Sequence, residues 1–153
     1  MTEQERNELM QIVRELSYEE REVTLASGRK SNFYFDGKQT ALHAKGGLLV
    51  GKAFWEIVKT FDGPIHGVGG LTMGADPIAT ATSIAANLDG NPVHAFIIRK
   101  EPKGHGTGQW LEGRKNLPHG SRVVIVEDVT TTGDSSMKAV DRAQQEGLEV
   151  LGI

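Results

Sequence analysis

Residues 123–126 read Val-Val-Ile-Val, and two acids, Glu127 and Asp128, follow them directly. A short run of β-branched residues is typical of a strand that is buried on both faces of a parallel sheet. Ligands of such open α/β sheets bind beside the carboxyl ends of the strands. Because two carboxylates are costly to place there without a partner, we expect Glu127 and Asp128 to bind sugar hydroxyl groups or a metal ion.

The acids lead into a segment rich in hydroxyl groups and glycine, and then into a helix predicted over residues 135–145. Small side chains let the backbone curl around a bound group, and the free amides at a helix start favour phosphate. An ordinary turn, in which Asp134 or Ser135 caps the helix, is the alternative. The residues expected to bind a phosphate group are Thr130, Thr131, Thr132, Gly133, Asp134 and Ser135.

This stretch resembles the phosphoribosyl pyrophosphate (PRPP) signature of type I phosphoribosyltransferases, in which a hydrophobic strand precedes an acidic pair and a Thr/Gly-rich loop. The resemblance implies that Glu127 and Asp128 lie beside the ribose hydroxyls of PRPP. It also implies that the loop after them binds the ribose 5-phosphate.

A basic segment, Arg-Lys-Glu-Pro-Lys-Gly-His-Gly, occupies residues 99–106. No helical or strand period is evident between Arg99 and Arg122, and loops of that length in a compact domain are commonly lids, binding loops or disordered segments. Cations that close over a departing pyrophosphate would stabilise its charge and exclude water. The alternative is a solvated basic loop.

The basic segment resembles the catalytic loop of orotate phosphoribosyltransferases, in which Arg-Lys, a two-residue gap, Lys, one residue and His-Gly follow in order. The family implies a homodimer in which part of this loop reaches into the neighbouring subunit's site. Lys103 would then be the main catalytic cation, whereas His105 has an ordinary alternative as an exposed loop residue. The residues implied to contact pyrophosphate are Arg99, Lys100, Lys103 and His105.

Residues 24–36 predict a hairpin, with β-forming residues on both sides of a Ser-Gly-Arg-Lys turn. Tyr34 and Phe35 offer an aromatic face to a planar base, and Lys30 can attract an anionic one. Alternatively, the aromatic residues pack the hairpin onto the domain. Orotate phosphoribosyltransferases carry a similar Ser-Gly-x-x-Ser hairpin that covers the base. Some members have lysine where Ala26 stands, so any role of that lysine is absent here.

A glycine-rich loop is predicted over residues 67–77, after an apolar strand at residues 65–68. Glycines let backbone amides approach an anion closely. The spacing matches neither a dinucleotide fingerprint nor a Walker A loop. In the family that the chain resembles, the equivalent loop lies under the pyrophosphate, which implies that role for Gly70, Leu71, Thr72 and Met73.

The composition narrows the classes of partner. The formal net charge of −3 argues against nucleic acid, and no apolar run approaches the roughly 20 residues of a membrane span. The sequence has no cysteine, which excludes disulfides and thiol chemistry. We therefore expect a cytoplasmic protein with neither nucleic acid nor a membrane as partner.

The amino-terminal part is predicted to begin with an amphipathic helix and to contain a second helix over residues 45–61. Thr2 and Glu5 form a capping box for the first helix. Its apolar face is expected to consist of Leu9, Ile12, Val13 and Leu16. The mostly buried core positions of the second helix are expected to be Leu48, Leu49, Phe54, Trp55, Ile57 and Val58.

From residue 65 onward, strands and helices alternate. This order indicates an α/β fold, a mainly parallel twisted sheet flanked by helices as in type I phosphoribosyltransferases, with an amino-terminal helix and hairpin as a hood. Gly147 is expected to end the last helix. The strands are predicted at residues 65–68, 93–99, 122–126 and 148–153, and the helices at residues 78–88 and 135–145. We expect a single phosphoribosyltransferase domain, with a hood of about residues 1–40 and a core of about residues 41–153.

The resemblance also implies a reaction. Orotate phosphoribosyltransferases continue past the last predicted strand to an arginine that pairs with the base carboxylate, so we expect this chain to be truncated at its carboxyl end. The implied reaction transfers ribose 5-phosphate from PRPP to orotate and gives orotidine 5′-monophosphate in pyrimidine (UMP) biosynthesis, with Mg²⁺ carried mainly by the substrate and no metal cage of protein carboxylates. The alternatives are a phosphoribosyltransferase for another base and a non-catalytic regulator that senses PRPP.

Overall fold

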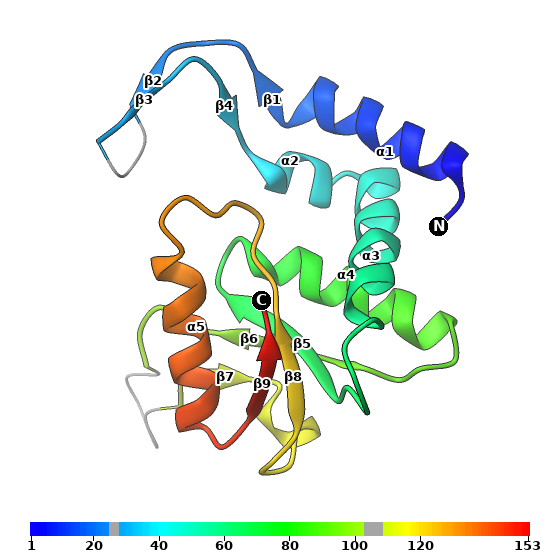
Figure 1. Cartoon of the computed structure of the whole chain (residues 1–153), viewed down its shortest axis with the longest axis vertical. Coiled ribbons are helices and arrows are strands. Elements are labelled where there is room, and N and C mark those ends of the chain that lie inside the picture. Colours follow the sequence, from blue (N-terminus) through cyan, green and yellow to red (C-terminus); the bar gives the residue numbers. More distant parts are fainter. Residues whose placement is uncertain (25–27, 103–108) are drawn as a thin grey trace.

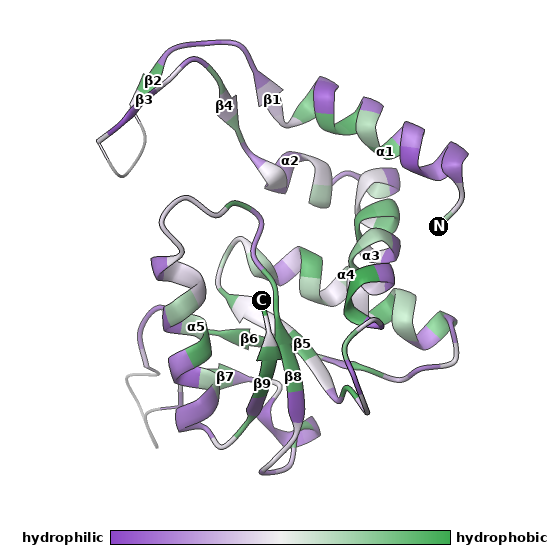
Figure 2. Ribbon diagram, in the orientation of Figure 1, coloured by the Kyte–Doolittle hydropathy of each residue, from purple (hydrophilic) through white to green (hydrophobic). Residues whose placement is uncertain are grey.

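The computed structural model of the protein describes residues 1–24, 28–102 and 109–153. A central sheet lies between helices, and the amino-terminal elements form a hood above one end of this sheet (Figure 1). The central strands are mostly hydrophobic, whereas the hairpin of the hood is largely hydrophilic (Figure 2). Two residues of the predicted site, Lys103 and His105, lie outside the described ranges.

Helix α1 (Glu3–Leu16) begins at the predicted capping box. The Glu5 amide donates to Thr2 Oγ1 at 3.2 Å, and the Thr2 amide donates to Glu5 Oε2 at 2.9 Å. The predicted apolar face is only partly covered: no residue of α1 is fully buried, and Leu16 is 42% exposed. The helix therefore covers the domain from outside and adds little to its core.

The predicted hairpin is present as two antiparallel pairs of short strands. In the first pair, β1 (Tyr18–Glu19) lies beside β4 (Tyr34–Phe35). In the second, β2 (Val23–Thr24) lies beside β3 (Lys30–Ser31). The hairpin extends over the end of the sheet from which the loop between β8 and α5 emerges (Figure 1).

Two helices connect the hood to the sheet. Helix α2 (Gly37–Ala41), which the sequence did not predict, is short and is capped by the Asp36 side chain. Helix α3 (Ala44–Val58) confirms the predicted second helix. The expectation that Leu48 and Ile57 belong to the core was wrong, because α3 buries only one side and these residues are 46% and 63% exposed.

The main sheet has the order β7-β6-β5-β8-β9 and is parallel except for the β6–β7 pair. This topology confirms the predicted α/β fold. The edge strand β7 and a 3₁₀ helix, η1 (Arg114–Asn116), lie where the sequence showed no period, so that region has more regular structure than expected. The strands of the sheet are β5 (Gly67–Leu71), β6 (His94–Ile98), β7 (Leu111–Glu112), β8 (Arg122–Ile125) and β9 (Glu149–Gly152).

Strand β5 runs further than predicted and takes in part of the expected glycine-rich loop. Gly70 and Leu71 are therefore strand residues and not loop residues. The glycines allow close packing: a Cβ added at Gly69 would collide with the Phe96 carbonyl oxygen, and one at Gly70 would collide with that of Val126. Glycine is disfavoured in most strands, which explains the incorrect boundary.

Helices cover both faces of the sheet. Helix α4 (Ala75–Leu88) begins earlier than predicted, and Pro77 lies in its first turn, where proline is tolerated. It packs with α3 against one face, whereas α5 (Asp134–Gln145) packs against the other. Gly147, with a φ of 78°, follows the end of α5 as predicted. Across the described ranges, no helix is long and apolar enough to cross a membrane.

Candidate active site

The acidic pair lies in the corner where β8 meets the end of β5. Glu127 and Asp128 follow β8, and the Val126 amide just before them donates to the Gly69 carbonyl oxygen of β5 at 2.8 Å. Gly74, before the first turn of α4, packs against both acids: an added Cβ would collide with Asp128 Oδ1 and lie 3.0 Å from Glu127 Oε1. The pair therefore lies at the carboxyl edge of the sheet, as the sequence predicted.

Hydrogen bonds engage both carboxylate oxygens of Asp128. Lys38 Nζ of α2 lies 3.2 Å from Asp128 Oδ2, and the Val129 amide donates to Oδ1 at 3.0 Å. The same lysine lies 2.8 Å from Asp36 Oδ1. These contacts lower the pKa of Asp36 and raise that of Lys38, chiefly through the hydrogen bond between the two. The sequence did not single out Lys38, because its partner is 90 positions away.

Glu127 lies in a less favourable environment. Burial raises the pKa of Glu127, and repulsion by Asp128 raises it further, while Lys100 opposes these effects weakly. Carboxylates in such a position gain most when a ligand brings hydroxyl donors or positive charge. The acidic pair is therefore suited to a polyhydroxyl group that develops positive charge.

A cavity of about 460 Å³ separates the hood hairpin from the loop after the acids. Arg29 lines the cavity, whereas the neighbouring Lys30 is not one of its lining residues. The predicted residues that this cavity brings together are Tyr34, Phe35, Asp128, Thr130, Thr131 and Thr132.

The start of α5 differs from the alternative of an ordinary capped turn. The N-cap is Gly133, with a φ of 84° and no side-chain cap, so neither Asp134 nor Ser135 caps the helix. The Asp134 amide lies 3.5 Å from Thr132 Oγ1. The first amides of α5 have no intrahelical acceptors and lie next to the threonines, an arrangement that suits a phosphate group.

The segment after β5 connects the acidic corner to α4. Thr72 Oγ1 donates to Asp76 Oδ2 at 2.7 Å, and the Met73 side chain is 69% exposed. The peptide bond between Thr72 and Met73 is cis. Thr72 and Met73 are the two residues of the predicted pyrophosphate loop that lie beyond the end of β5, next to Gly74.

The described part of the basic segment is anchored to the body of the domain. The Arg99 guanidinium donates to Glu112 Oε1 of β7 at 2.9 Å, so it points along the sheet edge. Lys100 is exposed and lies close enough to Glu127 to affect its pKa. Arg142 of α5 donates to the carbonyl oxygens of Arg99 and Lys100.

Comparisons with known proteins identify the family of the chain. The family model of the phosphoribosyl transferase domain matches residues 38–153. The orotate phosphoribosyltransferase of Nostoc sp. is 45% identical to the chain over 145 residues, which cover 95% of this chain and 68% of the relative. The chain belongs to the orotate phosphoribosyltransferases.

Solved structures of orotate phosphoribosyltransferases have the same fold. The Mycobacterium tuberculosis enzyme in complex with Fe(III) dicitrate is 42% identical, with a TM-score of 0.79, and the match covers 95% of this chain and 79% of that one. The same enzyme in complex with PRPP is 40% identical, with a TM-score of 0.74 and coverage of 95% and 78%. As a member of the orotate phosphoribosyltransferase family, the chain is a transferase.

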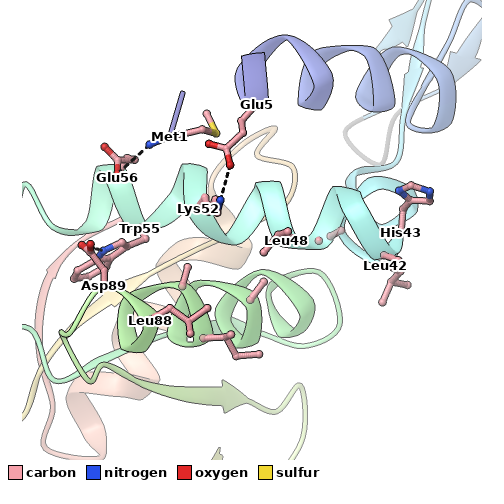
Figure 3. Close-up of a pocket in the computed structure, with 16 residues that line it drawn as sticks. Met1, Glu5, Leu42, His43, Leu48, Lys52, Trp55, Glu56, Leu88 and Asp89 are labelled. Carbon is pink, nitrogen blue, oxygen red and sulfur yellow. Dashed lines mark hydrogen bonds and ion pairs between the residues drawn. The ribbon is translucent and has the colours of Figure 1, made fainter. Parts of the chain in front are cut away.

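The chain has a second, larger cavity of about 640 Å³ between α1, α3 and α4 (Figure 3). Its apolar lining includes Leu42, Ile84 and Leu88, which are 73%, 56% and 76% exposed. Lys52 Nζ donates to Glu5 at its edge, and hydrogen bonds from Lys52 and Thr2 lower the pKa of Glu5 to about 2. None of the predicted site residues that the structure describes lines this cavity.

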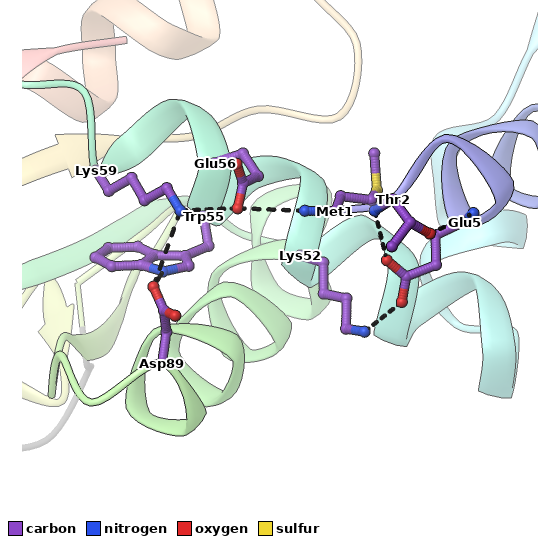
Figure 4. Close-up of polar contacts among 8 residues, drawn as sticks. All are labelled: Met1, Thr2, Glu5, Lys52, Trp55, Glu56, Lys59 and Asp89. Carbon is purple, nitrogen blue, oxygen red and sulfur yellow. Dashed lines mark hydrogen bonds and ion pairs between the residues drawn. The ribbon is translucent and has the colours of Figure 1, made fainter.

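Polar contacts along the same cavity join α1, α3 and α4 (Figure 4). The amino group of Met1 lies 3.4 Å from Glu56 Oε1, which also pairs with Lys59 at 2.8 Å. Lys59 lies 3.9 Å from Asp89 Oδ2, and Trp55 Nε1 donates to that oxygen at 2.8 Å. These contacts fix the ends of the two apolar helices that border the cavity.

Proposed function

We propose that this chain transfers the ribose 5-phosphate group of PRPP to a nitrogen of orotate, in pyrimidine biosynthesis. One observation carries the proposal: a single cavity is bordered by the aromatic hairpin, by Asp128 and by the threonine loop. A base, a ribose and a phosphate are joined in that order in the product, so three adjacent surfaces of these chemistries suit it.

The sugar half of PRPP is assigned to the loop after β8. Glu127 and Asp128 accept hydrogen bonds from the ribose hydroxyls, and their charge favours positive charge on the ribose ring as the bond to pyrophosphate breaks. The 5-phosphate is held by hydroxyl groups and amides at the start of α5. The residues assigned to it are Thr130, Thr131, Thr132, Gly133, Asp134 and Ser135.

The leaving group is assigned to the basic segment and to the loop after β5. The bond between C1 and the pyrophosphate oxygen breaks, and its electron pair leaves with pyrophosphate. The orotate nitrogen forms a bond to C1 and releases its proton to water. Positive side chains stabilise the departing charge. The residues assigned to pyrophosphate are Arg99, Lys100, Lys103, His105, Gly70, Leu71, Thr72 and Met73.

The base is assigned to the hood hairpin. Tyr34 and Phe35 provide an apolar surface for a planar ring. Positive charge for an anionic base is assigned to Lys30, as expected from the sequence, and to Arg29, which lines the same cavity.

Magnesium is assigned mainly to the substrate. In the described ranges, no three His, Cys, Asp or Glu side chains gather as a metal site. The acidic pair offers two carboxylates, so a hard cation would take most of its oxygen ligands from PRPP. Bound in this way, Mg²⁺ would neutralise part of the negative charge of pyrophosphate.

The assembly is assigned as a homodimer with shared active sites. A further apolar cavity lies beside the acidic corner and is lined by Lys38, Met73, Leu42 and Ile84. Leu42 and Ile84 also line the larger cavity between α1, α3 and α4. A partner subunit whose basic loop reaches this active site must bind next to the site. The exposed apolar surface from Met73 to Leu88 adjoins the acidic corner of the active site. We therefore place the second copy there.

The chain is assigned as one domain in the cytoplasm. The hood, about residues 1–40, closes one side of the cavity, and the core, about residues 41–153, supplies the acids and the phosphate loop. Neither half lines the cavity alone.

The test is an assay of orotate absorbance with PRPP and Mg²⁺. We expect absorbance to fall only when orotate, PRPP and Mg²⁺ are all present. In separate assays, adenine, hypoxanthine and uracil should not react. Asp128→Asn is the matched inactive control. Consumption of a different base, or none of orotate by the unmodified chain, would overturn the assignment.

A further inference from the structure

Lys38 connects two parts of the site that are far apart in the chain. Its ammonium group lies 2.8 Å from Asp36 Oδ1 and 3.2 Å from Asp128 Oδ2. Asp36 is itself fixed, because it caps α2 through the Lys38 amide at 3.2 Å and accepts from Gln39 Nε2 at 3.2 Å. The lysine therefore reaches Asp128 from a short, capped helix and not from a free loop.

The backbone around Lys38 leaves little room for movement. A Cβ added at Gly37 would lie 3.2 Å from Asp128 Cβ and 3.4 Å from Phe35 Cε1. The start of α2, the end of the hairpin and the acidic loop are thus in direct contact. A shift of α2 would move both the aromatic residue beside the base and the carboxylate beside the ribose.

Asp128 depends on this lysine for its electrostatic balance. Its side chain is only 9% exposed, and Glu127 lies directly beside it. Among the described residues, Lys38 is the cation that lies within 4 Å of a carboxylate oxygen of Glu127 or Asp128. Removal of one partner of a partly buried ion pair leaves the other charge uncompensated and free to turn toward its own backbone or toward water.

We propose that Lys38 is a positioning residue that orients the Asp128 carboxylate for the ribose hydroxyls of PRPP and couples its position to the hood. The proposal rests on the proposed function, since it concerns how the donor sugar is bound. Lys38 acts through Asp128 and is not assigned a contact with the reacting atoms.

The experiment measures PRPP binding by calorimetry with Mg²⁺ and the KM for PRPP with orotate. We expect Lys38→Met to weaken PRPP binding by about tenfold or more, as for the loss of a charged hydrogen bond, and Lys38→Arg to restore most of it. Lys45→Met is the matched control, because Lys45 pairs with Glu8 at the same 3.2 Å but lies away from the site. It should bind PRPP as the unmodified chain does.

A double-mutant cycle separates positioning from general stability. In an Asp128→Asn background, Lys38→Met should change PRPP binding by less than about twofold, because the two residues act as one unit. Equal effects of Lys38→Met in both backgrounds, or no effect in either, would overturn the role of Lys38 alone. Failure of the unmodified chain to bind PRPP would instead overturn the proposed function, and the role of Lys38 with it.

Discussion

The guanidinium carbon of Arg142 lies 3.9 Å from the centre of the Trp110 ring. The same side chain donates to the carbonyl oxygens of Arg99 and Lys100, the latter at 3.1 Å. One residue of α5 therefore holds the chain on both sides of residues 103–108. The basic segment is anchored to the helix whose first turn is assigned to the 5-phosphate.

Loss of this anchor is expected to slow turnover. Arg142→Ala should lower kcat about three- to tenfold, because the ends of the basic segment are no longer held in place and closure over pyrophosphate becomes less favourable. Steady-state kinetics measure the effect. Lys138→Ala, which removes a positive charge from an exposed position of the same helix, is the control and should leave kcat unchanged. Equal rates for Arg142→Ala and the unmodified chain would contradict the anchoring role.

Lys103→Ala is expected to lower turnover at least about tenfold and leave the fold intact, because one charged donor to the departing pyrophosphate is lost. Circular dichroism and steady-state rates provide the measurement. Lys115→Ala removes a positive charge from an exposed position of η1 and so tests the effect of net charge alone. Its turnover should equal that of the unmodified chain. An unchanged rate for Lys103→Ala would refute its assignment.

Glu127→Gln is expected to stabilise the protein at neutral pH and to weaken PRPP binding. The pKa of Glu127 is raised above its ordinary 4.5 in the fold, so proton binding favours the folded state. The unmodified chain therefore loses stability as the pH rises from 4.5 through the raised pKa, and glutamine avoids this loss.

Thermal unfolding at several pH values measures the difference. The Tm of Glu127→Gln should exceed that of the unmodified chain at pH 7.5, and the gap should shrink toward pH 4.5. Glu20→Gln, at an exposed position of the hood, should show no such pattern. A lower Tm for Glu127→Gln at pH 7.5 would show that burial of this carboxylate is not costly.

Leu88→Glu is expected to convert a dimer into a monomer, because a charge would be buried in the apolar surface assigned to the second copy. Light scattering after size-exclusion chromatography measures the mass. Ile57→Glu is the matched control: Ile57 is 63% exposed on α3 but outside the cavities described above. A monomeric unmodified chain, or a dimeric Leu88→Glu variant, would show that this surface is not a dimer interface.

Local sequence signals predicted much of this fold. The β-branched run at residues 123–126 forms β8 and the residue after it, all buried. The capping box at Thr2 and the glycine at position 147 mark helix ends as expected. Each of these features depends on neighbours a few positions away, so the sequence alone is sufficient to detect it.

Features that depend on distant contacts were missed. Strand β7 is two residues long and exists because it pairs with β6, and α2, with five residues, is too short to show the repeating apolar pattern that identifies a helix. Lys38 contacts Asp128 only because the fold brings α2 to the end of β8. Arg29 lines the cavity with residues about 100 positions away, a neighbourhood that the turn sequence does not reveal.

Gly74 packs against both acids with a hydrogen atom where other residues carry a carbon. The loop assigned to pyrophosphate and the acids assigned to ribose are therefore in direct contact at Gly74. A Cβ at position 74 would have to displace the end of the Asp128 side chain, so we expect even alanine there to turn the carboxylate that is assigned to the ribose.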